Sequence, residues 1–271
     1  MSSDAQIPVD GTAAVQANLR PGFFRSFLGV WTFEWQSRMT WGKLWTVAMS
    51  IFALPALMLL TMPHGSVDTF CHWAVTFYLL LVIPLNCLSF FGPMIRDDVQ
   101  ADTLPFVITR PLKRRTFYVL KYLCVMIWTQ MVSFLGCVLF ILVALLKGIS
   151  EIGQLMPYYF LAQFVAVVAF GALGGLMGLL SKKYMVLGVV YGFVVEWGIG
   201  SIPTNIHSLA VSFHIKSILA NVPFMQKEFG WTAAAVGEST LYAMSAAAVF
   251  LILGAIMFSI REFHHAEEMQ K

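Results

Sequence analysis

The sequence predicts an all-α polytopic membrane protein, and three observations support this fold class. Of 271 residues, 59% are hydrophobic and only 11% are charged, whereas a soluble domain carries about 25% charged residues. The mean hydropathy is +0.77, and apolar runs of membrane length recur along the chain. These runs show no alternation at period two, which argues against a transmembrane barrel. Lipid is therefore the expected solvent for most of the chain.

Six apolar runs reach or nearly reach the length of about 20 residues that a spanning helix needs. They are Leu44–Met62, Phe70–Gly92, Val119–Leu146, Pro157–Leu180, Tyr184–Ile202 and Glu238–Ile260. The fifth run is interrupted by Glu196 and several glycines. We therefore predict a transmembrane domain of six helices over residues 44–260.

The distribution of lysine and arginine predicts the topology. With a cytoplasmic N-terminus, 14 of the 17 basic residues fall in cytoplasmic segments, and only Lys147, Lys216 and Lys227 fall outside. Such a bias in short loops sets the orientation of membrane proteins. Both termini are therefore expected in the cytoplasm, residues 1–22 as a polar tail and residues 261–271 as a charged tail. The net charge of +3 is too small to predict a nucleic-acid partner.

Two segments outside the spans are too apolar to be free loops. Residues 23–43 mix aromatic side chains with charged ones, a composition typical of an amphipathic helix that lies at the membrane interface. Residues 203–237 are rich in apolar side chains but contain prolines and charges that prevent a further span. We predict an interfacial helix before the first span, and one or two short helices on or in the outer leaflet.

The cytoplasmic stretch 93–117 separates charges of opposite sign. Carboxylates come first, at Asp97, Asp98 and Asp102, and a basic cluster at residues 110–115 follows a short apolar segment. One interpretation is a solvated connector whose bases hold the topology and meet anionic membrane lipid. The other is a docking surface for a partner protein, which the apolar segment between the two charged blocks favours.

This stretch resembles the loop after the second helix in permease subunits of ABC transporters of the type II exporter kind, the ABC-2 family. In that family an acidic residue is followed by Gly-Thr-Leu and then by Arg-Pro-apolar-x-Arg. Asp98 stands at the acidic position, where Glu is commoner, and Asp102 replaces the Gly. The remaining matches are Thr103-Leu104 and Arg110-Pro111-Leu112-Lys113-Arg114. The six-helix layout and the long outer segment also match, and the resemblance implies a short re-entrant helical segment within residues 203–237.

In the ABC-2 family the loop forms a coupling helix that docks on a separate ATPase subunit. The resemblance therefore implies an ATPase-coupling site made of Arg96, Asp97, Asp98, Asp102, Thr103, Leu104, Arg110, Pro111, Arg114 and Arg115. It also implies a second permease copy (homodimer or related chain), export as the direction, and a location in the cell inner (plasma) membrane. The chain contains no G-x-x-x-x-G-K-[ST] motif, the loop that cradles nucleotide phosphates. We therefore expect no cofactor in this chain, with ATP and Mg bound by the partner.

Glu196 is the candidate functional residue inside the spans. A charge at the membrane centre costs about 2.5–3.5 kcal/mol on insertion scales and normally faces a protein or aqueous interior. The functional interpretations are a substrate contact, a proton site or a gate. The structural interpretation is a hydrogen-bonded carboxyl toward the outer end of the fifth run, and we favour it.

The sequence predicts neither a catalytic residue nor a metal site. The four cysteines show no CxxC spacing. His64, Asp68 and His72 are four residues apart, but Pro63 and Gly65 make the first part of that segment a turn. We therefore interpret these side chains as interfacial residues.

Two other function classes remain open from the sequence. An intramembrane lipid-modifying enzyme needs clustered acidic or histidine residues at the membrane boundary, and Asp97, Asp98 and Asp102 are the only candidates. Metal-dependent turnover of a substrate by the isolated chain would favour the enzyme class over a transporter. A non-transporting membrane scaffold is the other class, and ATP hydrolysis by its complex without movement of cargo identifies it.

Overall fold

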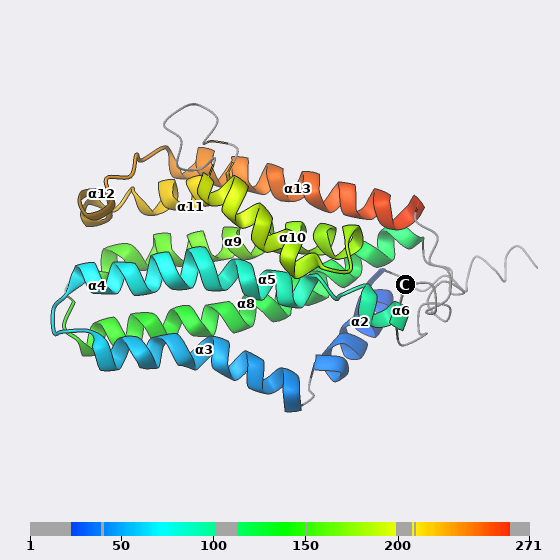
Figure 1. Ribbon diagram of the computed structural model, residues 1–271, viewed down its shortest axis with the longest axis horizontal. Coiled ribbons are helices and arrows are strands. Elements are labelled where there is room, and N and C mark those ends of the chain that lie inside the picture. Colours follow the sequence, from blue (N-terminus) through cyan, green and yellow to red (C-terminus); the bar gives the residue numbers. More distant parts are fainter. Residues whose placement is uncertain are drawn as a thin grey trace, which may run out of the picture.

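The computed structural model of the chain describes residues 23–38, 41–100, 113–149, 151–198, 208 and 210–260. All regular elements in these residues are helices, and no strand occurs among them (Figure 1). The long helices run side by side as one bundle. The all-α fold class is therefore confirmed.

Five helices are long and apolar enough to cross a membrane. Four are single α-helices: α3 (Trp41–Thr61), α8 (Arg114–Leu146), α9 (Ile152–Leu180) and α13 (Val236–Ile260). The fifth extends over Val67–Asp98 and comprises α4 (Val67–Cys71), η1 (His72–Val82), α5 (Ile83–Phe91), a turn at residues 92–95 and the start of α6 (Arg96–Gln100). These helices confirm five of the six apolar runs and a multi-pass membrane protein.

The remaining predicted run forms a shorter apolar helix. It consists of α10 (Tyr184–Tyr191) and the π-helical η2 (Gly192–Gly198). Residues 199–202, which complete the predicted run, lie outside the described part of the chain. The total of six spans therefore stays a prediction.

A π-helical register precedes Pro84 in the second membrane-length helix. The Ile83 amide donates to the Tyr78 carbonyl, five residues back, and the α-helical register resumes at Ile83–Phe91. Proline lacks the amide hydrogen that would continue the helix ladder, and a π-bulge is one way in which a helix accommodates such a defect. The helix thus passes Pro84 without breaking.

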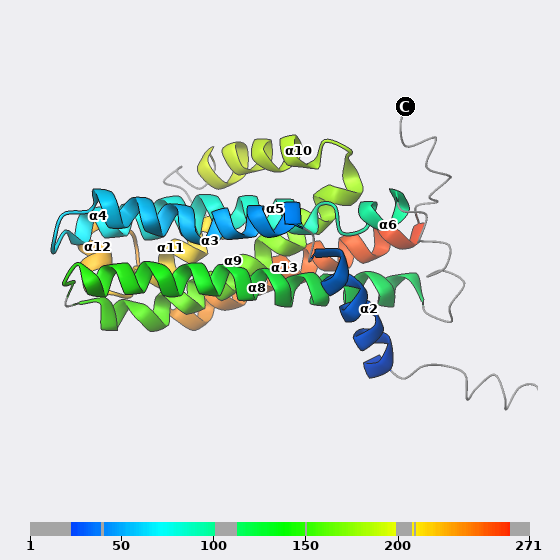
Figure 2. The same cartoon turned by 90° about the horizontal axis from the view of Figure 1, so that it is seen from below.

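Helix α9 is the centre of the bundle. It packs against α5, α8, α11 and α13, and nearly every residue from Val165 to Leu179 is buried. A helix that is hydrophobic on all sides is expected to be buried on all sides. Consistent with this, α9 lies between the other helices in both views (Figures 1 and 2).

Glycine on α9 allows α5 to approach closely. A Cβ added at Gly178 would overlap the Gly92 carbonyl, and one at Gly171 would lie 2.6 Å from the Phe91 ring. Small residues allow such close contacts between membrane helices. These two glycines therefore serve packing within one bundle.

The described N-terminal helix and the end of α13 lie at the same end of the bundle. Helix α2 (Phe23–Arg38) is inclined to the bundle axis at the end where α6, the start of α8 and the end of α13 also lie (Figure 2). We refer to this end as the α2 end. Its location on the cytoplasmic side stays a prediction.

Two short helices follow η2 in the predicted outer segment. They are α11 (Val211–Leu219) and α12 (Pro223–Phe229), and both lie toward the opposite end from α6. Helix α11 is largely buried against α9 and α13, so it belongs to the packed bundle. A re-entrant path through the membrane stays a prediction.

Candidate functional site

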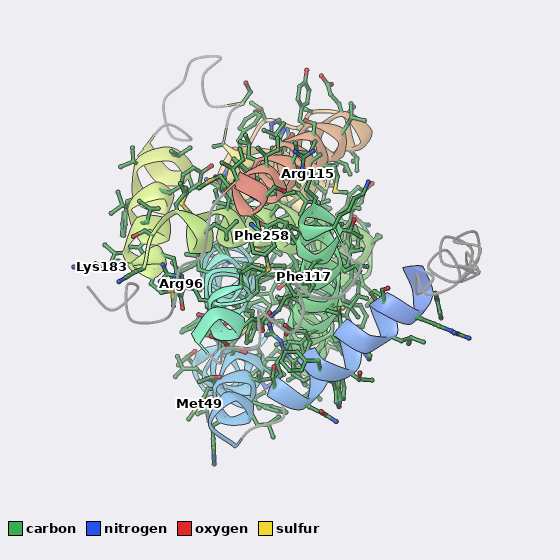
Figure 3. All side chains as sticks on the ribbon, turned by 90° about the vertical axis from the view of Figure 1, so that its right-hand side faces the viewer. Met49, Arg96, Arg115, Phe117, Lys183 and Phe258 are labelled. Atoms are coloured by element: carbon green, nitrogen blue, oxygen red, sulfur yellow. The ribbon has the colours of Figure 1, made fainter. Side chains whose placement is uncertain are left out.

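The predicted coupling residues lie at the α2 end of the bundle where the structure describes them. Arg96, Asp97 and Asp98 are in α6, and Arg114 and Arg115 begin α8. Figure 3 looks onto this end and shows Arg96 and Arg115 on neighbouring elements. The other predicted residues lie outside the described part of the chain: Asp102, Thr103, Leu104, Arg110 and Pro111.

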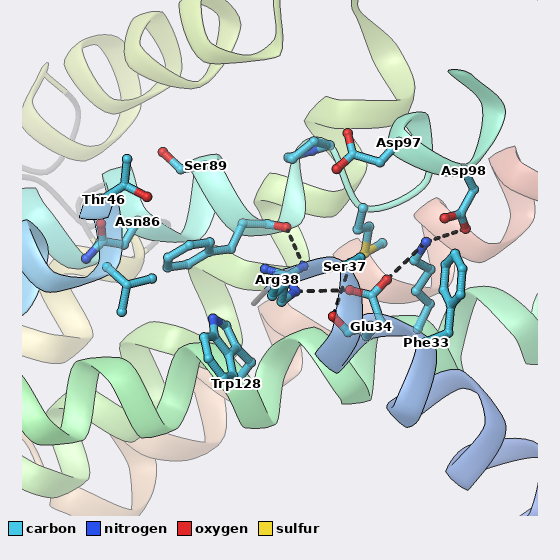
Figure 4. Close-up of a pocket in the computed structure, with 15 residues that line it drawn as sticks. Phe33, Glu34, Ser37, Arg38, Thr46, Asn86, Ser89, Asp97, Asp98 and Trp128 are labelled. Atoms are coloured by element: carbon cyan, nitrogen blue, oxygen red, sulfur yellow. Dashed lines mark hydrogen bonds and ion pairs between the residues drawn. The ribbon is translucent and has the colours of Figure 1, made fainter. Parts of the chain in front are cut away.

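A buried ion network joins three helices at this end. The Lys121 ammonium of α8 lies 3.0 Å from Glu34 Oε1 of α2 and also donates to Asp98 Oδ2 of α6. Arg38 Nε, one turn further along α2, donates to Glu34 Oε2 at 3.0 Å (Figure 4). The four side chains contribute two positive and two negative charges, so the network is neutral as a unit.

Arg38 extends the network to the second membrane-length helix. Arg38 Nη2 donates to the Phe90 carbonyl of α5 at 3.3 Å. The guanidinium carbon lies 5.7 Å from the centre of the Phe90 ring. A guanidinium over an aromatic ring is attracted by the ring quadrupole. The network therefore contacts α2, α5, α6 and α8.

These charges are removed from solvent to an unusual degree. Each of Glu34, Arg38, Asp98 and Lys121 is at most 9% exposed. The desolvation of buried ions is offset only when the partners are close and well hydrogen-bonded, which the short contacts around Lys121 provide. Loss of one member would leave another buried charge without its partner, so the four residues depend on one another.

A cavity of about 410 Å³ borders the network. Charged residues of α2 and α6 line one part of it, and Asn86, Ser89 and Trp128 from α5 and α8 line another (Figure 4). Tightly packed cores resist displacement of their elements. The packing beside α2 and α6 therefore leaves a cavity at this end.

Two further contacts tie this end to the last helices of the chain. The Arg96 guanidinium carbon lies 5.9 Å from the centre of the Tyr184 ring, which links α6 to α10. Arg115 Nε donates to Ser259 Oγ at 3.2 Å, which links α8 to the end of α13. These contacts connect α6 to α10 and the start of α8 to the end of α13.

Sequence reasoning missed three members of the network: Glu34, Arg38 and Lys121. The Glu34–Arg38 pair lies far in the chain from Asp98 and Lys121, and no periodicity connects these three places. Two signals were available, namely a carboxylate and a guanidinium four residues apart in an aromatic-rich helix, and a lysine inside an apolar run. Buried charges within membrane segments normally pair with one another.

The Glu196 carboxylate caps α11. Its Oε2 accepts from the Ser212 amide at 2.8 Å and its Oε1 from the Val211 amide at 3.3 Å. The first amides of a helix have no partner within the helix, and a carboxylate there also interacts favourably with the helix dipole. This geometry supports the structural interpretation of Glu196.

A histidine and two carboxylates form a small surface cluster at the end of the bundle opposite α6. Asp68 Oδ1 lies 3.2 Å from His72 Nε2, and a hydrogen bond with Asp68 raises the pKa of Glu228 on α12. His64 lies in the turn before α4. No group of three or more potential metal ligands is present among the residues that the structure describes.

Comparison with known proteins identifies the family. No curated protein matches the chain. A family model described as ABC-2 family transporter protein matches residues 37–196, more than half of the sequence. The match begins at the end of α2, includes Asp98 and Lys121 of the ion network, and ends at Glu196 in η2. This multi-pass helical chain therefore belongs to the ABC-2 family, as a permease component of an ABC transporter.

Proposed function

We propose that this permease is driven by ATP hydrolysis in a separate ATPase subunit and acts as an exporter. The ATPase docks on the cytoplasmic stretch 93–117, and its ATP and Mg stay within the partner. The resemblance of this stretch to the coupling helix of type II exporters supports both the docking site and the direction. Both termini face the cytoplasm, and the complex resides in the cell inner (plasma) membrane.

The ion network around Lys121 is the observation that carries the coupling proposal. Asp98 belongs to α6, which begins within the proposed docking stretch, and Lys121 belongs to a membrane-length helix. Their direct contact offers a short path from the docked ATPase into the membrane domain. Displacement of α6 then moves α8 and, through Glu34, α2. Helix displacements of this kind are a recurrent way to couple distant sites.

The working transporter contains two permease chains, either identical or related. Helices α10 and η2 expose Val186, Val190, Phe193 and Val194. Within a membrane such apolar side chains contact either lipid or another helix. The resemblance to type II exporters supports a second copy in the complex, together with two ATPase subunits.

A charge reversal at Arg114 tests the docking site. Arg114 is exposed at the start of α8, so Arg114→Glu should leave the fold intact. Exposed charges at an interface steer association, and we expect reduced recovery of the ATPase with the permease and reduced ATP hydrolysis by the purified complex. Equal ATPase recovery in Arg114→Glu and the original chain would count against the docking site.

Lys183→Glu is the matched control. Lys183 is exposed at the same end of the bundle (Figure 3) but lies outside the proposed docking stretch. It should retain both ATPase recovery and hydrolysis. A chain that never co-purifies with an ATPase would contradict the transporter mechanism, whereas ATP hydrolysis by the complex without movement of cargo would favour the scaffold interpretation.

An intramembrane lipid-modifying enzyme is less consistent with the geometry. Its candidate acidic group includes Asp98, whose carboxylate is buried and bonded to Lys121. A carboxylate engaged in this way is poorly placed to hold a catalytic cation. Metal-dependent turnover by the isolated chain is the measurement that would favour this alternative.

A further inference from the structure

A second cavity, of about 490 Å³, lies between the second membrane-length helix and the α10–η2 helix. Helix α9 forms its floor through Phe170 and Leu173, and α11 closes one end through Ser212 and Lys216. Helix α10 lies beside α5 and α9, as Figures 1 and 2 show. We refer to this cavity as the α5–α10 groove.

The rim of the α5–α10 groove is apolar and exposed. Phe77 and Leu81 line one side, and Val189 and Phe193 line the other; all four are exposed. These residues lie within apolar helices, so the groove opens toward the hydrocarbon of the bilayer. An empty groove would forfeit dispersion contacts, and the surrounding hydrocarbon supplies a chain to fill it.

The α11 end of the groove carries a cation, Lys216. Within the described residues, no carboxylate lies within ion-pair distance of Lys216 Nζ; its described contact is the Trp231 ring, whose centre is 5.8 Å away. Glu196 also lines the groove, but both of its oxygens accept backbone hydrogen bonds from α11. Burial lowers the pKa of Lys216, although the charge of Glu196 opposes this shift.

We infer that the α5–α10 groove binds one phospholipid, whose acyl chain lies between α5 and α10 and whose phosphodiester contacts Lys216. The apolar walls match the chain, and the half-buried ammonium matches the anionic phosphate. Lysine binds phosphate as a flexible point charge, and a long side chain directs its charge toward the membrane surface. This site does not require the proposed ATP coupling, so either proposal stands if the other fails.

Gly192 provides a direct test of the acyl-chain position. It lines the groove, and a Cβ added there meets no atom within 4 Å. Because its Cβ meets open space, we expect the side chain of Gly192→Leu to occupy part of the groove. Gly153, at the start of α9, also has open space around an added Cβ but does not line the groove, so Gly153→Leu is the matched control.

The probe is phosphatidylglycerol with a photoreactive diazirine in the middle of one acyl chain, added to nanodiscs that contain the full chain. Peptide mapping should place cross-links within residues 77–88 and 188–193. Gly192→Leu should abolish these cross-links and Gly153→Leu should keep them. Lys216→Met should reduce them about tenfold, the effect of losing a charged contact worth about 1.5 kcal/mol, and Lys216→Arg should restore them.

Three results would overturn the inference. Unchanged labelling in Gly192→Leu would place the acyl chain elsewhere. Equal labelling by a diacylglycerol probe, or unchanged labelling in Lys216→Met, would show that the phosphodiester does not contact Lys216. Efficient cross-linking of Phe193→Cys between two copies, without lipid labelling, would identify the groove as an interface between permease chains.

Discussion

At the scale of single residues, Lys121 holds the α2 end of the bundle together. Its ammonium contacts carboxylates from two other helices, Glu34 of α2 and Asp98 of α6, and it lies between the Phe33 and Phe117 rings at about 6 Å. The aromatic faces supplement the two carboxylates. Lys121 is 1% exposed, so its charge depends on these protein contacts.

Replacement of Lys121 by methionine should destabilise the protein strongly. The change leaves Glu34 paired with Arg38 and removes the ion pair between Lys121 and Asp98, and loss of one member of a buried ion pair costs about 3–5 kcal/mol. We expect a lower melting temperature of the detergent-solubilised chain. Lys183→Met removes an exposed lysine and should leave the melting temperature unchanged; similar values for both variants would contradict the prediction.

At the scale of helices, the contact between α9 and α5 depends on the absence of a side chain at Gly178. The Gly92 backbone occupies the position that a Cβ would take, and α9 is surrounded by other helices. Backbone atoms yield less readily than the end of a flexible side chain. Because the two helices are this close, a residue with a Cβ does not fit at position 178 without displacing the Gly92 backbone.

Gly178→Ala should separate α9 from α5 and destabilise the bundle by about 1–3 kcal/mol, the usual range for overpacking. Gly153→Ala is a control in the same helix, because a Cβ there meets open space. Alanine forms helix more readily than glycine, so the control should melt at the same temperature or slightly higher. Melting of both variants in detergent tests the prediction, and equal stability would contradict it.

Hydropathy predicted the helices better than it predicted their contacts. Five apolar runs became membrane-length helices, because an apolar run of this length has few alternatives in lipid. The run that contains Glu196 is described only as a shorter helix, and its carboxylate bonds to α11, a partner that periodicity does not reveal. Similarly, the approach of Glu34, Asp98 and Lys121 follows from the packing of three helices distant in sequence.

At the scale of the whole molecule, the α2 end combines a rigid contact with free space. The ion network joins α6 to α8 and α2 and reaches α5 through Arg38, and a cavity of about 410 Å³ lies beside it. Arg96 and Arg115 extend the connection to α10 and α13. A force applied at α6 is thus expected to move several helices together rather than to bend one.

Stability and coupling should therefore be separable at this network. Buried ion pairs are often replaced by apolar residues of similar size without loss of stability. The combined variant Glu34→Met, Arg38→Leu, Asp98→Leu and Lys121→Met should recover most of the melting temperature lost in Lys121→Met.

The combined variant also removes the charged contacts between α6 and α8, so the amount of cargo moved per ATP hydrolysed should fall in reconstituted vesicles. Lys121→Arg, which keeps the charge, should retain coupling. If the apolar variant transports at the original ratio, the network stabilises the fold but does not transmit the motion of the ATPase.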